Sequence, residues 1–341
     1  MPSYHLIGDE AFDLLLLGGY YVTPKTVLER ASLNESQIDE ICTQLKIEDK
    51  DKPFADKDLE KFKSALKSNT LYREAVLYNS KSAYAPTIDY FRQEGLFENE
   101  YVAIVDSGWT GSMQRSMRQI LESAGYKGKL IGFYFGMYVK PKHPEDGEYL
   151  TFYFDANSGA RRKAAFSNNL FECMLSANHP MTVGYTDANG TMSPVFAKPS
   201  SDKQLALIEQ QIQGALEYAD KKLKDQSDYN YSDAVRECYK TLKKCMVYPT
   251  KEIASVYGAF NFCDDVTEGY QMSLANPKNR AALGNYMLVI RVFRKLLKTK
   301  KGNAGELFWP YGVIAFCPAI LRPWYRFNVK AWELLKAILK K

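Results

Sequence analysis

The segment Tyr101-Val-Ala-Ile-Val-Asp-Ser-Gly-Trp-Thr-Gly-Ser-Met-Gln114 joins an apolar run to a turn rich in Gly, Ser and Thr. Its first five residues are all apolar, which is typical of a strand buried on both faces. The turn follows at residues 106–112, and an amphipathic pattern comes next, with Met113, Met117 and Ile120 on one side. The segment therefore predicts a strand, a ligand-binding turn and a helix.

A second apolar run at residues 130–139 alternates in hydrophobicity, as a strand does. Strand, helix and strand in this order form a βαβ unit with a right-handed crossover. Further strands are expected at 149–154 and in a hairpin around Asp187-Ala-Asn-Gly190. We therefore predict an α/β fold, in which a mostly parallel sheet carries a βαβ phosphate-binding unit and is flanked by N-terminal and C-terminal helices.

Helical patterns fill the chain on both sides of these strands. Residues 1–98 form a predicted N-terminal helical part, 99–200 an α/β core with the turn, and 201–341 a C-terminal helical part. No Pro-, Gly- or Ser-rich linker separates them, so one continuous domain is the alternative. Pro86 is expected to separate two helices, and residues 280–298 are expected to form one helix.

The composition is that of an ordinary folded protein. Hydrophobic residues make up 46% and charged residues 25% of the 341, which excludes large-scale disorder. The N-terminus lacks the features of a signal peptide, and the run Leu14 to Leu17 is too short to span a bilayer, so a cytoplasmic location is expected. The six cysteines are scattered without a CxxC pair, which predicts reduced packing residues.

The net charge of +5 is unevenly distributed along the chain. Residues 271–341 contain 14 Lys or Arg and two acidic residues, a net charge of +12, which leaves −7 for the first 270 residues. The basic amphipathic pattern from Trp324 to Lys341 suits an anionic membrane surface. The alternative is a docked terminal helix with a solvated face. We expect peripheral contact with the inner face of the cytoplasmic membrane and no nucleic-acid partner.

The turn at residues 106–112 has the composition of an anion site. Gly108 and Gly111 let the backbone turn tightly, and the N–H groups at the start of the following helix favour bound phosphate. Asp106 cannot bind phosphate directly, but its carboxylate suits ribose hydroxyls or a metal ion. Further hydrogen-bond donors are the hydroxyl groups of Ser107, Thr110 and Ser112.

Trp109 is an unusual residue for a turn that contains two glycines. A large aromatic side chain at this position favours a lid or a stacking surface for a sugar ligand. The alternative for the whole segment is a tight turn in which a Ser or Thr side chain caps the helix and no ligand binds.

Several motifs together resemble one protein family. The segment 106–114, preceded by Tyr90-Phe-Arg-Gln-Glu-Gly-Leu96, resembles the glycan phosphoribosyltransferase region of bacterial ribofuranosyltransferases, which are often labelled predicted hydrolases of the haloacid dehalogenase superfamily. The Gly-Trp-x-Gly-Ser element is the most specific part. The resemblance covers most of residues 80–315 through four further segments: Phe171-Glu-Cys-Met-Leu175, Val183-Gly-Tyr185, Pro249 to Phe260 and Trp309-Pro-Tyr-Gly312.

The resemblance implies transfer of a 5-phosphoribosyl group from phosphoribosyl diphosphate to a hydroxyl of a bacterial surface glycan, such as an O-antigen or capsule. Asp106 would face the ribose, residues 107–112 would hold the 5-phosphate, and Gln114 would support the turn. The acceptor glycan would be lipid-linked. Because the chain lacks the DxDx(T/V) motif of the phosphatase domain that accompanies this family, we expect a separate phosphatase.

Loss of diphosphate through an oxocarbenium-like state requires positive charge at the leaving group and a base near the acceptor hydroxyl. Arg161 and Arg162 are the candidate diphosphate clamp, with a solvated basic loop as the alternative, and Mg²⁺ would add positive charge. Asp264 and Asp265 are candidates for magnesium binding or acceptor activation, unless they cap the following helix. Glu172 is a further candidate acid, because a carboxylate in an apolar helix is unusual unless it is paired.

Two other functions compete with this interpretation. A nucleotide-sugar glycosyltransferase would place a nucleotide base against Trp109. A non-catalytic scaffold of polysaccharide assembly would keep the fold without the donor chemistry. The absence of an Arg-Asp-Gly element, which is associated with the early part of the transferase region, favours the scaffold.

Overall fold

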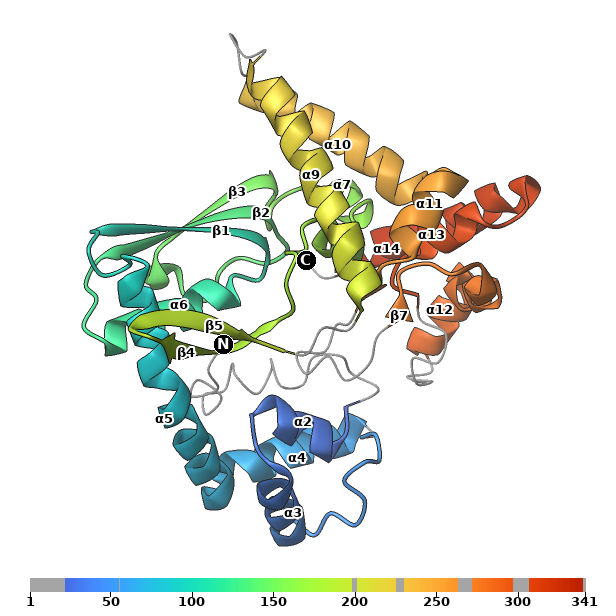
Figure 1. The fold of residues 1–341 in the computed structure, drawn as a ribbon. Helices are drawn as coiled ribbons and strands as arrows, with labels where there is room; N and C mark the ends of the chain where they lie inside the picture. The colour runs from blue at the N-terminus through green and yellow to red at the C-terminus, as the bar shows by residue number, and fades with distance from the viewer. Residues whose placement is uncertain are drawn as a thin grey trace.

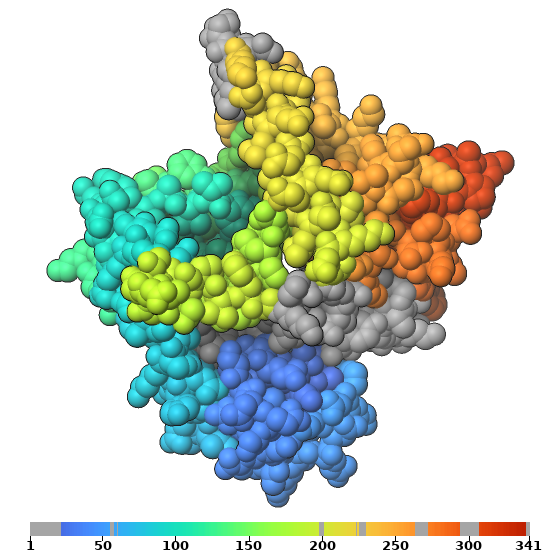
Figure 2. Space-filling model, viewed as in Figure 1, coloured from blue at the N-terminus to red at the C-terminus, as the bar shows by residue number. Residues whose placement is uncertain are grey.

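The computed structural model describes residues 22–54, 56–197, 201–224, 230–262, 272–296 and 307–339. Figure 1 shows a small sheet on the left, N-terminal helices below it and C-terminal helices on the right. A long helical hairpin projects at the top, and Figure 2 shows that it stands out from the rest of the surface.

A three-stranded parallel sheet in the order β1-β2-β3 forms the centre of the left-hand part. The central strand β2 (Lys129–Met137) pairs with β1 (Tyr101–Trp109) on one side and with β3 (Glu148–Phe154) on the other. The helix α6 (Ser112–Ser123) connects β1 to β2. The predicted α/β class with a parallel sheet is therefore confirmed.

Helices and two short antiparallel sheets surround these strands. The N-terminal helices are α2 (Pro24–Arg30), α3 (Glu35–Gln44), α4 (Asp56–Ser68) and α5 (Thr70–Gln93). The elements that follow α6 on the sheet side are η3 (Pro144–Asp146), α7 (Ala160–Ala164), α8 (Asn168–Met174), β4 (Thr182–Ala188) and β5 (Thr191–Phe196). The later elements are α9 (Asp202–Lys224), α10 (Tyr231–Val247), α11 (Lys251–Gly258), β6 (Asn261–Phe262), β7 (Met272–Ser273), η4 (Pro277–Tyr286), α12 (Leu288–Leu296), α13 (Pro310–Ala315), η5 (Ala319–Leu321) and α14 (Arg322–Leu339).

The described part of the chain covers one face of the parallel sheet far better than the other. On the first face, α6 and the C-terminal end of α5 pack against the strands. On the opposite face, Val105, Phe133 and Leu150 lie in one row across the strands and are 86%, 45% and 45% exposed. The prediction that residues 101–105 form a strand buried on both faces is therefore wrong, because an apolar sequence does not ensure that a neighbouring element packs against it.

Two helix boundaries also differ from the predictions. The helix α5 continues through Pro86, which removes the hydrogen bond to the Ser82 carbonyl. Ser82 is exposed, so water can bind this carbonyl without breaking the helix. The predicted helix 280–298 is interrupted at Met287, between η4 and α12.

Packing distributes the large side chains over several cores. The N-terminal helices have a core of their own, which includes Leu28 and Leu66. A second core joins Leu170 of α8 to Trp309 and Val329 near the end of the chain, so it crosses residue 200. The hairpin around residues 187–190 is confirmed as the turn between β4 and β5.

Three properties apply to the described residues as a whole. The five cysteines among them are free. No group of three or more His, Cys, Asp or Glu side chains there is arranged to hold a metal ion. Within the same ranges, every helix is too short or too polar to cross a membrane.

A buried glutamine fixes α6 on the sheet. Gln114 is fully buried, its Nε2 donates to the Glu148 carbonyl (3.2 Å) and its Oε1 accepts from the Tyr134 hydroxyl (2.9 Å). Gly132 provides the space for this amide, since a Cβ there would lie 2.1 Å from Gln114 Oε1. The first turn of α6 is thus held against β2 and β3.

We predict that Gly132→Ala lowers the free energy of unfolding by about 1–3 kcal/mol, because the new methyl group overlaps the Gln114 amide and the Tyr134 ring. Gly184→Ala is the matched control, since a Cβ on that strand residue meets nothing within 4 Å. It should leave stability unchanged or raise it by up to about 1 kcal/mol. Denaturant unfolding of both variants checks this, and equal midpoints for the two would contradict it.

Candidate functional site

The strand β1 is longer than predicted and includes much of the expected turn. Gly108 pairs with Gly136 and Trp109 pairs with Met137. Gly108 has a φ of +114°, and a Cβ on it would lie 2.1 Å from the Gly136 carbonyl oxygen. Gly108 therefore permits close contact between two strands, and the turn itself is reduced to Thr110 and Gly111.

The helix α6 begins without a side-chain cap. Gly111 is its N-cap residue, with a left-handed φ of 74°, and no side chain accepts a hydrogen bond there from the first-turn N–H groups. The alternative in which Ser or Thr caps this helix is therefore not observed. Thr110 is exposed, and its Oγ1 donates to Ser112 Oγ (3.2 Å). The N–H groups and the positive end of the helix dipole suit an anion.

Trp109 packs into the protein and does not form an open lid. Its Nε1 donates to Glu172 Oε1 (2.6 Å), which ties β1 to α8. Its φ of 85° is left-handed, and such a conformation costs a bulky residue about 1–3 kcal/mol. Four aromatic rings lie within 6.3 Å of the indole, centroid to centroid: Phe154, Phe166, Phe171 and Tyr138.

Two candidate carboxylates lie at this end of the sheet. Glu172 is half-buried, and burial raises its pKa. The hydrogen bond from Trp109 lowers that pKa, whereas the negative charge of Asp106 raises it further. Asp106 accepts a hydrogen bond from Ser107 Oγ (3.3 Å). The structure therefore brings Asp106 and Glu172 within electrostatic range of each other, although they come from different elements.

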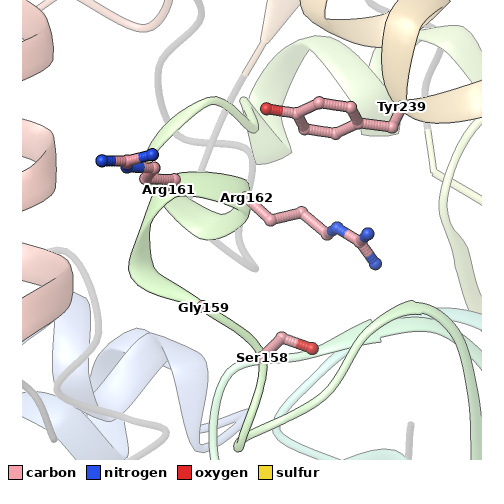
Figure 3. Close-up of a pocket in the computed structure, with 5 residues that line it drawn as sticks. All are labelled: Ser158, Gly159, Arg161, Arg162 and Tyr239. Atoms are coloured by element: carbon pink, nitrogen blue, oxygen red, sulfur yellow. The ribbon is translucent and has the colours of Figure 1, made fainter. Parts of the chain in front are cut away.

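Arg161 and Arg162 line a hollow of about 400 Å³ together with Ser158, Gly159 and Tyr239 (Figure 3). The Arg162 guanidinium donates to the Tyr153 carbonyl (2.7 Å) and lies 5.6 Å from the centre of the Tyr239 ring. Figure 3 shows that the two arginines point in different directions. They therefore do not converge on one point.

The hollow and the turn are separate features at the same edge of the sheet. None of residues 106–112 lines the hollow. It adjoins the end of β3, however, and neighbouring strands lie about 4.8 Å apart, so β3 is about 10 Å from β1. In open parallel sheets, ligands bind outside the carboxyl ends of the strands. Both features therefore lie at the edge of the sheet where such ligands bind.

Other predicted residues are placed differently or lie outside the described residues. Gln114 has its side chain inside the fold, so it supports the helix and does not face a ligand. Asp264 and Asp265 belong to residues 263–271, outside the described ranges.

Sequence reasoning missed an ion pair beside the turn. Arg115, in the first two turns of α6, donates to Asp146 Oδ1 (2.6 Å). Asp146 is only 4% exposed, so the charge of Arg115 is already balanced within the protein. The sequence around η3 did not predict this contact, because Arg115 and Asp146 are 31 positions apart in the chain.

No known family model matches this chain, and no curated protein matches its sequence. The assignment of a function therefore rests on the residues, on their motifs and on the geometry above.

We predict that Glu172 makes the folded protein less stable as the pH rises above 4.5, which is the ordinary pKa of a glutamate side chain. Because its pKa is higher in the folded protein than in the unfolded chain, the folded state binds the proton more tightly. The stability of the wild type relative to Glu172→Gln should therefore fall between 4.5 and the raised pKa, by at most about 1.4 kcal/mol per pH unit. Denaturant unfolding of both proteins from about pH 4 to about pH 8 measures this. If the relative stability rises over this range instead, the hydrogen bond from the Trp109 indole lowers the pKa of Glu172 by more than burial raises it.

Proposed function

We propose that this protein transfers a 5-phosphoribosyl group from phosphoribosyl diphosphate to a hydroxyl of a bacterial surface glycan. The observation that carries the proposal is the uncapped N-terminus of α6, which closely follows the parallel strand that carries Asp106. The resemblance of residues 106–114 to glycan phosphoribosyltransferases supports the choice of ligand.

In this proposal the donor spans the edge of the sheet. Its 5-phosphate accepts hydrogen bonds from the first N–H groups of α6 and from the Thr110 and Ser112 hydroxyls. Asp106 accepts from a ribose hydroxyl. The diphosphate extends toward the exposed Arg161 near the end of β3, a lateral distance of about 10 Å from β1, and Arg162 adds positive charge nearby while it donates to the Tyr153 carbonyl.

Magnesium fits this arrangement, because Mg²⁺ in proteins commonly uses one or two carboxylates together with substrate phosphates. Asp106 would hold the ion, which would supply positive charge at the departing diphosphate.

Glu172 is the proposed base for the acceptor. In the transfer, a bond forms between the acceptor oxygen and the anomeric carbon, the bond to diphosphate breaks, and the hydroxyl proton passes to a carboxylate. A pKa raised by burial makes Glu172 a stronger base than an exposed carboxylate. The Trp109 indole, which donates to its Oε1, would fix its orientation. Asp264 and Asp265 remain sequence-based candidates for the same role.

The packing of Trp109 disfavours the nucleotide-sugar alternative. A stacked nucleotide base needs an open aromatic face, whereas this indole already contacts four rings and Glu172. A phosphoribosyl donor has no base to stack, so it does not need that face.

We expect Thr110→Glu to weaken binding of phosphoribosyl diphosphate by at least about tenfold, because its carboxylate repels the 5-phosphate. The same charge near the N-terminus of α6 favours the helix dipole, so folding should be preserved. Thr110→Gln, similar in size and neutral, is the control and should bind almost normally. Calorimetric titration with Mg²⁺ present measures both. Equal affinity in the two variants would remove the turn from the donor site, and absence of binding by the wild type would overturn the proposal.

The exposed Arg161 allows the two ends of the donor to be tested separately. Arg161→Gln should weaken the binding of phosphoribosyl diphosphate by about tenfold, because a charge-assisted contact to the diphosphate is lost. Ribose 5-phosphate, which lacks the diphosphate, should bind this variant and the wild type equally. Equal losses for both ligands would show that Arg161 does not contact the diphosphate. Tighter binding of a nucleotide sugar would favour the alternative enzyme class.

A further inference from the structure

The C-terminal helix α14 docks through one face and exposes apolar side chains on another. Val329 and Trp332 are buried against the neighbouring helices. Trp324 and Phe327, in contrast, are 57% and 62% exposed, and their spacing places them on one side of the helix. Ile338, three turns further along the same side, is 53% exposed. A solvated face would carry polar residues at these positions.

The exposed apolar area extends onto the adjacent elements. Leu288 at the start of α12 donates its N–H to Asn328 Oδ1 on α14 (2.9 Å), so the two helices are in contact. Figure 1 shows α12 on the right-hand side, whereas α14 reaches back toward α7 beside the sheet, and α14 and α7 are in contact. We define the α12–α14 surface by six exposed side chains: Val289 (76%), Phe293 (61%), Ile320 (86%), Leu321 (43%), Trp324 (57%) and Phe327 (62%).

The surroundings of this surface are strongly basic. The described residues 272–296 and 307–339 contain nine Lys or Arg and one acidic residue, Glu333, a net charge of +8. Lys278 and Lys330 are exposed, and their elements η4 and α14 are in contact. Apolar side chains thus protrude from a part of the protein that has almost no negative charge.

We propose that the α12–α14 surface binds an anionic lipid bilayer, with its apolar side chains inserted at the interface and its basic residues on the lipid headgroups. Trp and Phe are favoured at the boundary between headgroups and acyl chains, and each Lys or Arg near the surface adds attraction to anionic lipid. This inference does not depend on the proposed enzymatic activity.

Charge complementarity selects this partner over two others. A second copy of the chain would bring two faces of equal positive charge together, which repel each other. A nucleic acid would accept the basic residues, but it would leave Val289 and Ile320 without an apolar environment. An anionic bilayer satisfies both the charges and the apolar side chains.

The test is sedimentation of the full chain with vesicles of phosphatidylcholine alone or mixed with phosphatidylglycerol. We expect binding to the mixed vesicles that weakens as salt increases. Trp324→Ala/Phe327→Ala should bind at least about tenfold less, because two large apolar side chains no longer insert. The matched control is Leu216→Ala/Tyr218→Ala on α9, which removes two side chains that are each 59% exposed and should bind normally.

Charge is tested by Lys278→Glu/Lys330→Glu, which should weaken binding to the mixed vesicles by at least about tenfold. Thermal unfolding of every variant establishes that it is folded. The proposal is overturned if the wild type does not sediment with mixed vesicles, or if the α9 variant loses as much binding as the α14 variant. A dimer or a DNA complex that Trp324→Ala/Phe327→Ala abolishes, without vesicle binding, would assign the surface to that partner instead.

Discussion

The buried amide of Gln114 is the interaction on which the candidate site depends. Its two hydrogen bonds, to the Glu148 carbonyl and the Tyr134 hydroxyl, join α6 to both β2 and β3. A buried amide without partners would cost about 1–3 kcal/mol, so the helix has one favourable position on the sheet. Gly132 has no side chain where the amide lies. The N-terminus of α6 is thereby held at the carboxyl end of β1.

Around this contact, the two ends of the sheet edge have different properties. At β1, Trp109 is fixed by aromatic packing and by Glu172, and the polar groups at the turn are the helix N-terminus and the Thr110 and Ser112 hydroxyls. At β3, the Arg161 and Arg162 hollow provides positive charge. Uncapped N–H groups and arginine side chains about two strand spacings apart are the arrangement that the proposed donor, with phosphates at both ends, would use.

Two exposed apolar areas among the described residues differ in the charge around them. Val105, Phe133 and Leu150 lie in an exposed row on one face of the parallel sheet. Helices normally cover both faces of such a sheet. The α12–α14 surface belongs to a part of the chain that is rich in Lys and Arg. This positive charge favours an anionic partner.

The sequence by itself determined much of the local structure, although not the end of β1 or the course of the helices at Pro86 and Met287. It predicted the strands on both sides of α6, the hairpin at residues 187–190 and the basic C-terminal region, because periodicity, turn residues and charge are local properties. Tertiary structure decided the rest. The contact between Trp109 and Glu172 spans 63 positions, and the contact between Leu288 and Asn328 spans 40. Whether Val105 is covered, and whether Trp109 is open, depends on which distant segments pack there, and no local pattern encodes that choice.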